Sequence, residues 1–179
     1  MIDYTKEELV ELLRKHPEKF NEWKAQQEEV DLSEVDFTGV VLNEVDFTDA
    51  DLNSSSFADA QLSLVKFNNV DLTSADFTRA KLLECDFTDS LLTGADCSYA
   101  QMSYCNFTDC DMAGCILSET VLSHSDLTGA VNLDASRFDA ETVWPEQELL
   151  PEDFEGVYDS DLSSLRDDEE ENFSSDGEY

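Results

Sequence analysis

The sequence predicts an all-β solenoid, and two observations lead to that prediction. An apolar residue recurs at every fifth position, without insertion or loss, from Leu32 to Leu127. Two positions before each of these twenty residues stands a small residue (Val, Ala, Cys, Ser or Thr), from Val30 to Ser125. A period of five fits neither an α-helix nor an alternating strand, because both would rotate the apolar positions away from one another. The chain must therefore turn a corner every five residues.

The other positions of each unit are typical of turns. The residue before the apolar centre is often Asp or Asn, and the one after it is mostly Ser, Thr or Asn, whose short side chains bond nearby backbone. The units ADFTR (75–79), VDLTS (70–74), ADLNS (50–54) and SDLTG (125–129) resemble the pentapeptide-repeat family. The resemblance implies a right-handed quadrilateral β-helix of four units per coil, with the central and small residues pointing inward. Twenty units then make about five coils, a rod about 24 Å long.

Three segments are predicted: an N-terminal helical cap (1–29), the pentapeptide-repeat β-helix (30–144) and an acidic C-terminal tail (145–179). In the cap, Thr5 and Glu8 have the spacing of a capping box, and an apolar stripe that includes Leu9 follows them. Pro17 is well placed to begin a second helical turn, which carries Phe20. A cap is expected because stacked coils expose unpaired backbone at their ends.

The C-terminal part of the chain departs from the repeat. The register shifts by one residue at Val131–Asn132, which makes Leu133 and Phe138 the last centres. Residues 131–179 contain seventeen acidic and two basic residues, and the part after about Asp159 is predicted to be disordered. Two interpretations stay open: a partly docked cap with a solubilising tail, or an acidic-hydrophobic arm that folds onto a basic partner.

The net charge limits the kind of partner. With 43 acidic and 10 basic residues the formal charge is −33, which argues against direct binding of nucleic acid or of an anionic membrane. The N-terminus lacks the pattern of a signal peptide, and no run of eighteen apolar residues occurs. The five cysteines are an odd number on the repeat lattice, which favours buried thiols. A cytoplasmic protein is therefore expected.

Catalysis is not expected. Only His16 and His124 could act as acid-base groups near neutral pH, and no phosphate-binding loop, HExxH motif or nucleophile elbow occurs. Cys105, Cys110 and Cys115 lie five residues apart and could in principle hold zinc, but Ala, Val and Ser fill the same position elsewhere. Small core residues are the better account, so neither a metal nor another cofactor is predicted.

Because residues twenty apart stack in such a coil, the composition of each outer wall can be predicted. Aspartates gather in columns on three walls: Asp46, Asp86 and Asp126 with Asp49, Asp89 and Asp109; Asp36, Asp76 and Asp96; and Asp31, Asp51, Asp71 and Asp111. The fourth wall is nearly neutral and presents Val41, Leu64, Leu83, Tyr104 and Val121. It is a candidate seat for a partner, a second copy in a homodimer, or the C-terminal arm.

Three hypotheses follow for the function. Some pentapeptide-repeat proteins, the quinolone-resistance group, are acidic rods that bind DNA gyrase in place of DNA, and this sequence is similar in repeat, size and charge. The resemblance implies a DNA mimic that binds a basic DNA-handling protein such as a topoisomerase through the aspartate columns. The alternative is an interaction scaffold or regulatory module that uses the neutral wall or the tail. The third is that the acidic walls only maintain solubility.

Overall fold

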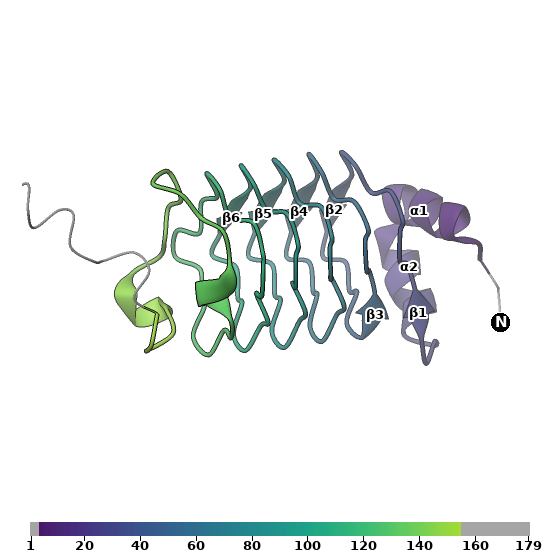
Figure 1. Cartoon of the computed structure of the whole chain (residues 1–179). Helices are drawn as coiled ribbons and strands as arrows, with labels where there is room; N and C mark the ends of the chain where they lie inside the picture. The colour runs from purple at the N-terminus through teal and green to yellow at the C-terminus, as the bar shows by residue number, and fades with distance from the viewer. Residues whose placement is uncertain (1–3, 155–179) are drawn as a thin grey trace, which may run out of the picture.

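Short parallel strands stacked into a rod form the body of the protein, as the computed structural model in Figure 1 shows. The structure describes residues 4–154, so the predictions made for the tail beyond residue 154 lie outside the described residues. No helix within the described part has the length and the apolar character needed to span a membrane.

The strands stack in a register of twenty residues. β1 (Val30–Asp31) pairs with β3 (Ala50–Asp51), whereas β2 (Val41–Asn43), β4 (Gln61–Ser63), β5 (Lys81–Leu83) and β6 (Gln101–Ser103) form one four-stranded parallel sheet. Single parallel bridges, such as Asp76 to Asp96, continue the same register on the other walls. Each coil therefore takes twenty residues, in agreement with the four units per coil that the family resemblance implies.

The interior consists of the two repeating positions that the sequence singles out. All twenty central residues and all twenty small residues before them are buried. Phe67 stacks on Phe47 and Phe87, with ring centroids 5.4 and 4.7 Å apart, and meets Phe57 and Phe77 edge-on across the coil. The phenylalanines thus form two columns that interlock through the rod axis.

The corners depend on left-handed backbone. Each of the twenty residues two positions after a centre has a φ between 53° and 73°, and only four of them are glycine. Turns of this kind favour Gly, Asn or Asp at that position. Leu64 and Tyr99 also occupy it, although a left-handed conformation costs roughly 1–2 kcal/mol for a side chain with a Cβ. The hydrogen bonds between stacked coils, such as those from Leu64 N to Leu83 O and from Tyr99 N to Ser118 O, must offset this cost.

Two helices close the N-terminal end of the rod (Figure 1). α1 (Lys6–Lys15) begins with the predicted capping box, in which Glu8 N donates to Thr5 Oγ1 and Thr5 N donates to Glu8 Oε2. α2 (Pro17–Lys24) begins at Pro17 and buries Phe20, whose ring lies 5.5 Å from that of Phe47. The helices thereby continue the core past the first coil.

Polar side chains of the helical segment also bond the backbone of the first coil. Asn21 Nδ2 donates to Glu44 O at 2.8 Å, and Asp46 N donates to Asn21 Oδ1 at 3.0 Å. Lys6 Nζ donates to Ser33 O at 2.7 Å, and Lys24 Nζ donates to Thr48 O. These bonds satisfy backbone groups that no preceding coil can reach.

The C-terminal end is closed by an irregular segment. Arg137 pairs with Ile116 at a spacing of 21 residues, which agrees with the shift expected at Asn132, and Val143 pairs with Val121 at a spacing of 22. Two short 3-10 helices, η1 (Leu133–Ala135) and η2 (Gln147–Leu149), follow the path of the coil. Leu127 N donates to Leu149 O, and Leu150 is buried. The rod therefore extends beyond the boundary predicted at residue 144, because Leu149 and Leu150 complete its last layer.

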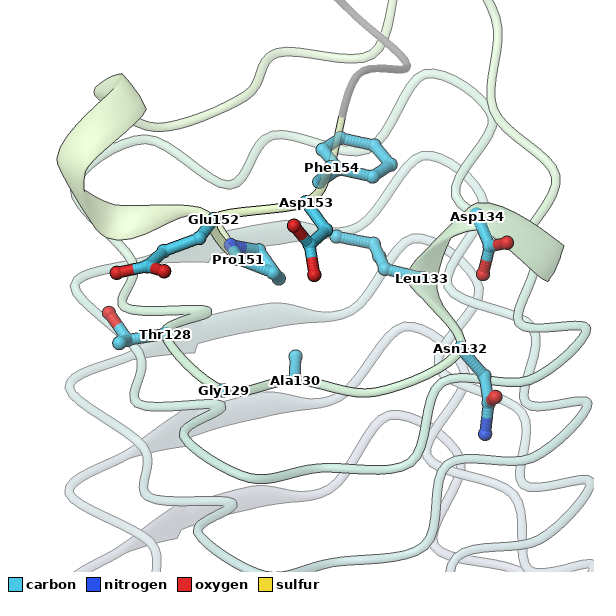
Figure 2. Close-up of a pocket in the computed structure, with 10 residues that line it drawn as sticks. All are labelled: Thr128, Gly129, Ala130, Asn132, Leu133, Asp134, Pro151, Glu152, Asp153 and Phe154. Carbon is cyan, nitrogen blue, oxygen red and sulfur yellow. The ribbon is translucent and has the colours of Figure 1, made fainter.

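An open hollow of about 550 Å³ lies at this end (Figure 2). Figure 2 shows Ala130 on its floor and the segment Pro151–Phe154 passing over it. Its wall includes Leu133 and the carboxyl groups of Asp134 and Asp153. The hollow lies where a further coil would stack, so it belongs to the end of the rod.

Candidate interaction surfaces

The aspartates before the centres have a local structural role. At all ten such positions the backbone N–H of the residue two places later donates to the aspartate Oδ1, at 2.8–3.1 Å. Asn106 accepts the same bond from Thr108 N at 3.0 Å, through an amide oxygen in place of a carboxylate oxygen. Because the turn bond uses Oδ1, the Oδ2 atom of each aspartate is not needed for the turn.

Hydrogen bonds keep several of these carboxyl groups ionised. The pKa of Asp36 lies below its ordinary value because the Thr38 side chain and backbone stabilise the carboxylate. For Asp46, partial burial opposes ionisation, but the hydrogen bonds from Thr48 and the nearby Lys24 still lower the pKa. For Asp86, burial is similarly outweighed by Asn68 and Thr88. These three carboxyl groups are therefore fixed negative charges at neutral pH.

The predicted columns are present, although other residues interrupt them. Asp46, Asp86 and Asp126 stack in one line, with Lys66 between the first two and Asn106 between the last two. The predicted wall did not include Lys66, although counting twenty residues on from Asp46 leads to it. In the second line Ser56 separates Asp36 from Asp76, whereas Asp76 and Asp96 are direct neighbours. Asp49, Asp89 and Asp109 lie exposed at left-handed corner positions, and Asp49 Oδ1 accepts a hydrogen bond from Asn69.

The charge of residues 30–130 is divided unevenly among the four walls, which we name after their first residues. The Asp31 wall carries Asp31, Glu34, Asp51, Asp71 and Asp111, for a net charge of −5. The Asp36 wall carries Asp36, Asp59, Asp76, Asp96 and Glu119 with Arg79, for −4. The Asp46 wall carries Asp46, Asp49, Asp86, Asp89, Asp109 and Asp126 with Lys66, for −5. The neutral wall carries Glu44 and Glu84 with Lys81, for −1.

The neutral wall is the outer face of the four-stranded sheet (Figure 1). Val41, Leu64, Leu83 and Tyr104 are exposed on it, whereas Val121 is half-buried. A shallow groove of about 430 Å³ runs along the four strands, from Val41 to Ser103. At the C-terminal end of this wall, the Tyr104 ring stacks on His124, whose Nδ1 lies 2.7 Å from Glu146 Oε1. The wall therefore presents a shallowly grooved, partly apolar surface.

Groups with catalytic chemistry do not come together in the described part of the chain. His16 and His124 are both exposed, one in the N-terminal cap and one in the last full coil. Cys105, Cys110 and Cys115 are buried at small core positions, and burial raises the pKa of Cys110 to about 12. Within residues 4–154 no group of three or more His, Cys, Asp or Glu side chains could hold a metal ion.

Comparison with known proteins agrees with this architecture. A model described as a pentapeptide repeat region matches residues 24–96, and a model of eight pentapeptide repeats matches residues 105–139. Comparison with curated proteins finds no match.

Three solved structures illustrate the likeness. A pentapeptide repeat protein of the Arabidopsis thaliana thylakoid lumen is 30% identical, with 60% of this chain and 67% of that one covered and a TM-score of 0.32. A pentapeptide repeat protein from Nostoc is also 30% identical, with 54% and 75% covered and a TM-score of 0.45. A plasmid-mediated fluoroquinolone resistance protein, QnrB1, is 11% identical, with 63% and 90% covered and a TM-score of 0.40.

Proposed function

The chain belongs to the pentapeptide-repeat family, and we propose that it is a non-enzymatic acidic rod that occupies the DNA-binding surface of a basic protein. The first candidate partner is a DNA topoisomerase such as DNA gyrase. The observation that supports this proposal is the array of aspartates whose Oδ1 atoms are fixed by the turns. Fixed anions lose little conformational freedom on binding, so more of their attraction to a basic surface contributes to affinity.

The amount of charge is of the right order for such mimicry. Residues 30–130 carry eighteen acidic and three basic residues, a net charge of −15. Five coils at ordinary strand spacing extend about 24 Å, over which duplex DNA carries about fourteen phosphate charges. A surface that evolved to attract DNA would therefore attract this rod over a comparable length.

The proposal is tested by a gyrase supercoiling assay with the purified protein and an aspartate-to-asparagine variant. The variant changes Asp46, Asp49, Asp86, Asp89, Asp109 and Asp126 to Asn. Asn106 shows that an amide can keep the turn bond of Asp46, Asp86 and Asp126, and Asn69 occupies the same left-handed corner position as Asp49, Asp89 and Asp109. We therefore expect this variant to lose charge and to keep the fold. We expect the parent to inhibit supercoiling or to protect gyrase from a quinolone, and the variant to be at least about tenfold weaker.

Two controls accompany this assay: a rise in salt concentration, and a variant in which a different acidic wall is neutralised. Inhibition should weaken as salt is raised, because screening reduces attraction between exposed charges. A matched variant with Asp31, Asp51, Asp71 and Asp111 changed to Asn tests whether the partner uses one wall in particular. If the parent has no effect at micromolar concentration, gyrase is not the partner. If the six-residue variant inhibits as well as the parent, the acidic columns do not act as a DNA mimic.

A protein-interaction scaffold is the second candidate function, and the neutral wall is the observation that favours it. This wall exposes Leu83 and Tyr104 at 46% and 57% of their surface. Binding through this face would be insensitive to the aspartate changes and would not weaken as salt is raised.

A further inference from the structure

We infer that the neutral wall is the interface of an antiparallel homodimer, in which a second copy of this chain lies face to face with the first and end for end. The twofold axis lies in the plane of the interface, runs perpendicular to the long axis of the rod, and passes through the coil that contains Lys81. This inference does not depend on whether the acidic walls bind a DNA-handling protein. It rests on the order of the side chains on the wall and on the charge of the other walls.

Within the five coils, the first line of side chains on the wall reads the same in both directions. The ladder stacks Val41, Gln61, Lys81, Gln101 and Val121 in that order, and Val143 of the end segment follows Val121. A twofold interface must be self-complementary, because each residue meets the residue related to it by the axis. Reversing the line about Lys81 places Val41 opposite Val121 of the second copy, and Gln61 opposite Gln101. Apolar side chains then meet apolar ones, and amides meet amides.

The corner line is complementary under the same operation. It consists of Glu44, Leu64, Glu84, Tyr104 and His124, each two residues after a centre and each exposed. Reversal about Glu84 places Leu64 opposite Tyr104 of the second copy and Glu44 opposite His124. Because Nδ1 of His124 already faces Glu146, its Nε2 is the atom left for Glu44 of the second copy.

The level of the axis combines an apolar centre with charges that balance. Leu83 lies between Ser63 and Ser103 in the ladder, so the leucines of the two copies can nest together above small neighbours. Lys81 and Glu84 flank Leu83. On the axis Lys81 faces Lys81 of the second copy, and Glu84 faces Glu84. Each lysine must therefore extend along the strand direction to approach Glu84 of the other copy, about 10 Å away, and the four charges then sum to zero.

Electrostatic repulsion leaves this wall as the favourable one for contact between copies. Each chain carries a formal charge of −33, and the three acidic walls carry −4 or −5 each within residues 30–130. Contact through any of those walls would bring like charges together. The neutral wall carries only −1 and exposes apolar side chains.

The size of the wall limits the strength of the dimer. Five coils spaced about 4.8 Å apart give the wall a length of roughly 24 Å, and three residues that each rise about 3.3 Å along the strand give it a width of roughly 10 Å. That face is smaller than the roughly 800 Å² per partner of a standard stable interface. We therefore expect a weak, concentration-dependent dimer that forms at high micromolar protein concentration, strengthened by salt because screening reduces the repulsion between the two acidic rods.

Sedimentation of the full chain tests the association. We expect monomer at low micromolar and dimer at high micromolar concentration, with the balance moving toward dimer as sodium chloride is raised from 0.05 to 0.5 M. Leu83→Asp should weaken the dimer at least tenfold. The matched control is Leu91→Asp, because Leu91 is equally exposed, at 45% against 46% for Leu83, but lies on the Asp31 wall. Thermal unfolding of each variant shows whether the fold is kept.

Cross-linking tests the antiparallel arrangement. A mixture of Val41→Cys and Val121→Cys proteins, treated with oxidised glutathione, should form a mixed disulfide dimer, whereas either variant alone should not. The native cysteines are buried and do not compete. Three results would overturn the inference: a monomer at every concentration and salt tested, a dimer that Leu91→Asp weakens but Leu83→Asp does not, or self-linking of Val41→Cys alone. Protection of the wall from hydrogen exchange in a strictly monomeric protein would show that the chain's own C-terminal segment covers it.

Discussion

At the scale of single residues, each repeat unit encodes its own corner. The aspartate before the centre caps the N–H two places later, and the small residue leaves room for the turn of the chain. At three of the four positions where that small residue is Ser or Thr, its hydroxyl also bonds a backbone carbonyl of another unit. Thr120 Oγ1 donates to Cys97 O at 2.7 Å, and Ser125 Oγ donates to Met102 O at 2.6 Å. Both bonds lie inside the core, where an unpaired polar group is costly.

Two buried serines should respond in opposite ways to loss of the hydroxyl. Ser125 Oγ also accepts a bond from Cys105 N, so Ser125→Ala should cost about 1–3 kcal/mol of stability. Ser55 Oγ is the buried side-chain oxygen without a hydrogen-bond partner within residues 4–154. Ser55→Ala should therefore be neutral or stabilising by up to about 1 kcal/mol. Urea unfolding of both variants provides the measurement. A loss of stability in Ser55→Ala would show that its hydroxyl is paired.

At the scale of elements, the helical segment acts as a substitute for the missing preceding coil. Apolar residues of both helices continue the core, while Asn21 supplies one donor and one acceptor to the first coil. A repeat rod without such a cap would expose a ladder edge able to pair with another molecule.

Asn21→Ala should therefore destabilise the protein by about 1–3 kcal/mol, because it leaves Glu44 O and Asp46 N without their bonds. Asn43→Ala is the control, since Asn43 is exposed and its amide bonds the side chain of the exposed Glu44, and it should change stability by less than about 0.5 kcal/mol. Chemical denaturation measures both, and light scattering follows end-to-end association. Equal stability of the two variants would argue that the helices seal the rod by apolar packing alone.

At the scale of the whole molecule, the acidic surface makes stability depend on pH. The pKa of Asp31 is lowered to about 2, first by the hydrogen bond from Lys6 and then by those from Ser33. A carboxyl group whose pKa is lower in the folded state stabilises the fold above its ordinary pKa. That contribution is lost as the pH falls through the folded value.

The stability lost in Asp31→Asn should therefore be largest above about pH 4 and should approach zero near pH 2. Lys6→Met removes the other member of the pair and should reproduce most of this pH dependence, and the double variant should add little. Thermal unfolding between pH 7 and pH 2 gives the comparison. If the stability lost in each single variant does not change with pH, this ion pair does not cause the acid sensitivity.

The sequence by itself determined the body of the rod. The period of five follows from the sequence, and the family resemblance implies four units per coil. Together they place residues twenty apart in contact, so the inward positions, the phenylalanine columns and the charge of each wall follow from counting. Lys66 in the Asp46 wall was open to the same arithmetic. This succeeds because each coil repeats the same local chemistry, and the small and apolar positions have no other direction in which to be buried.

Only the tertiary structure decided the ends of the rod and the details of its surface. The bonds from Asn21 and Lys24 to the first coil depend on how the helices dock, which no periodic pattern records. The extra residue before Val143 and the burial of Leu150 depend on how the last layer closes over the core. The turn bonds to Oδ1 depend on corner geometry. These features are set by contacts between segments that do not repeat, and so they follow from docking and not from the period.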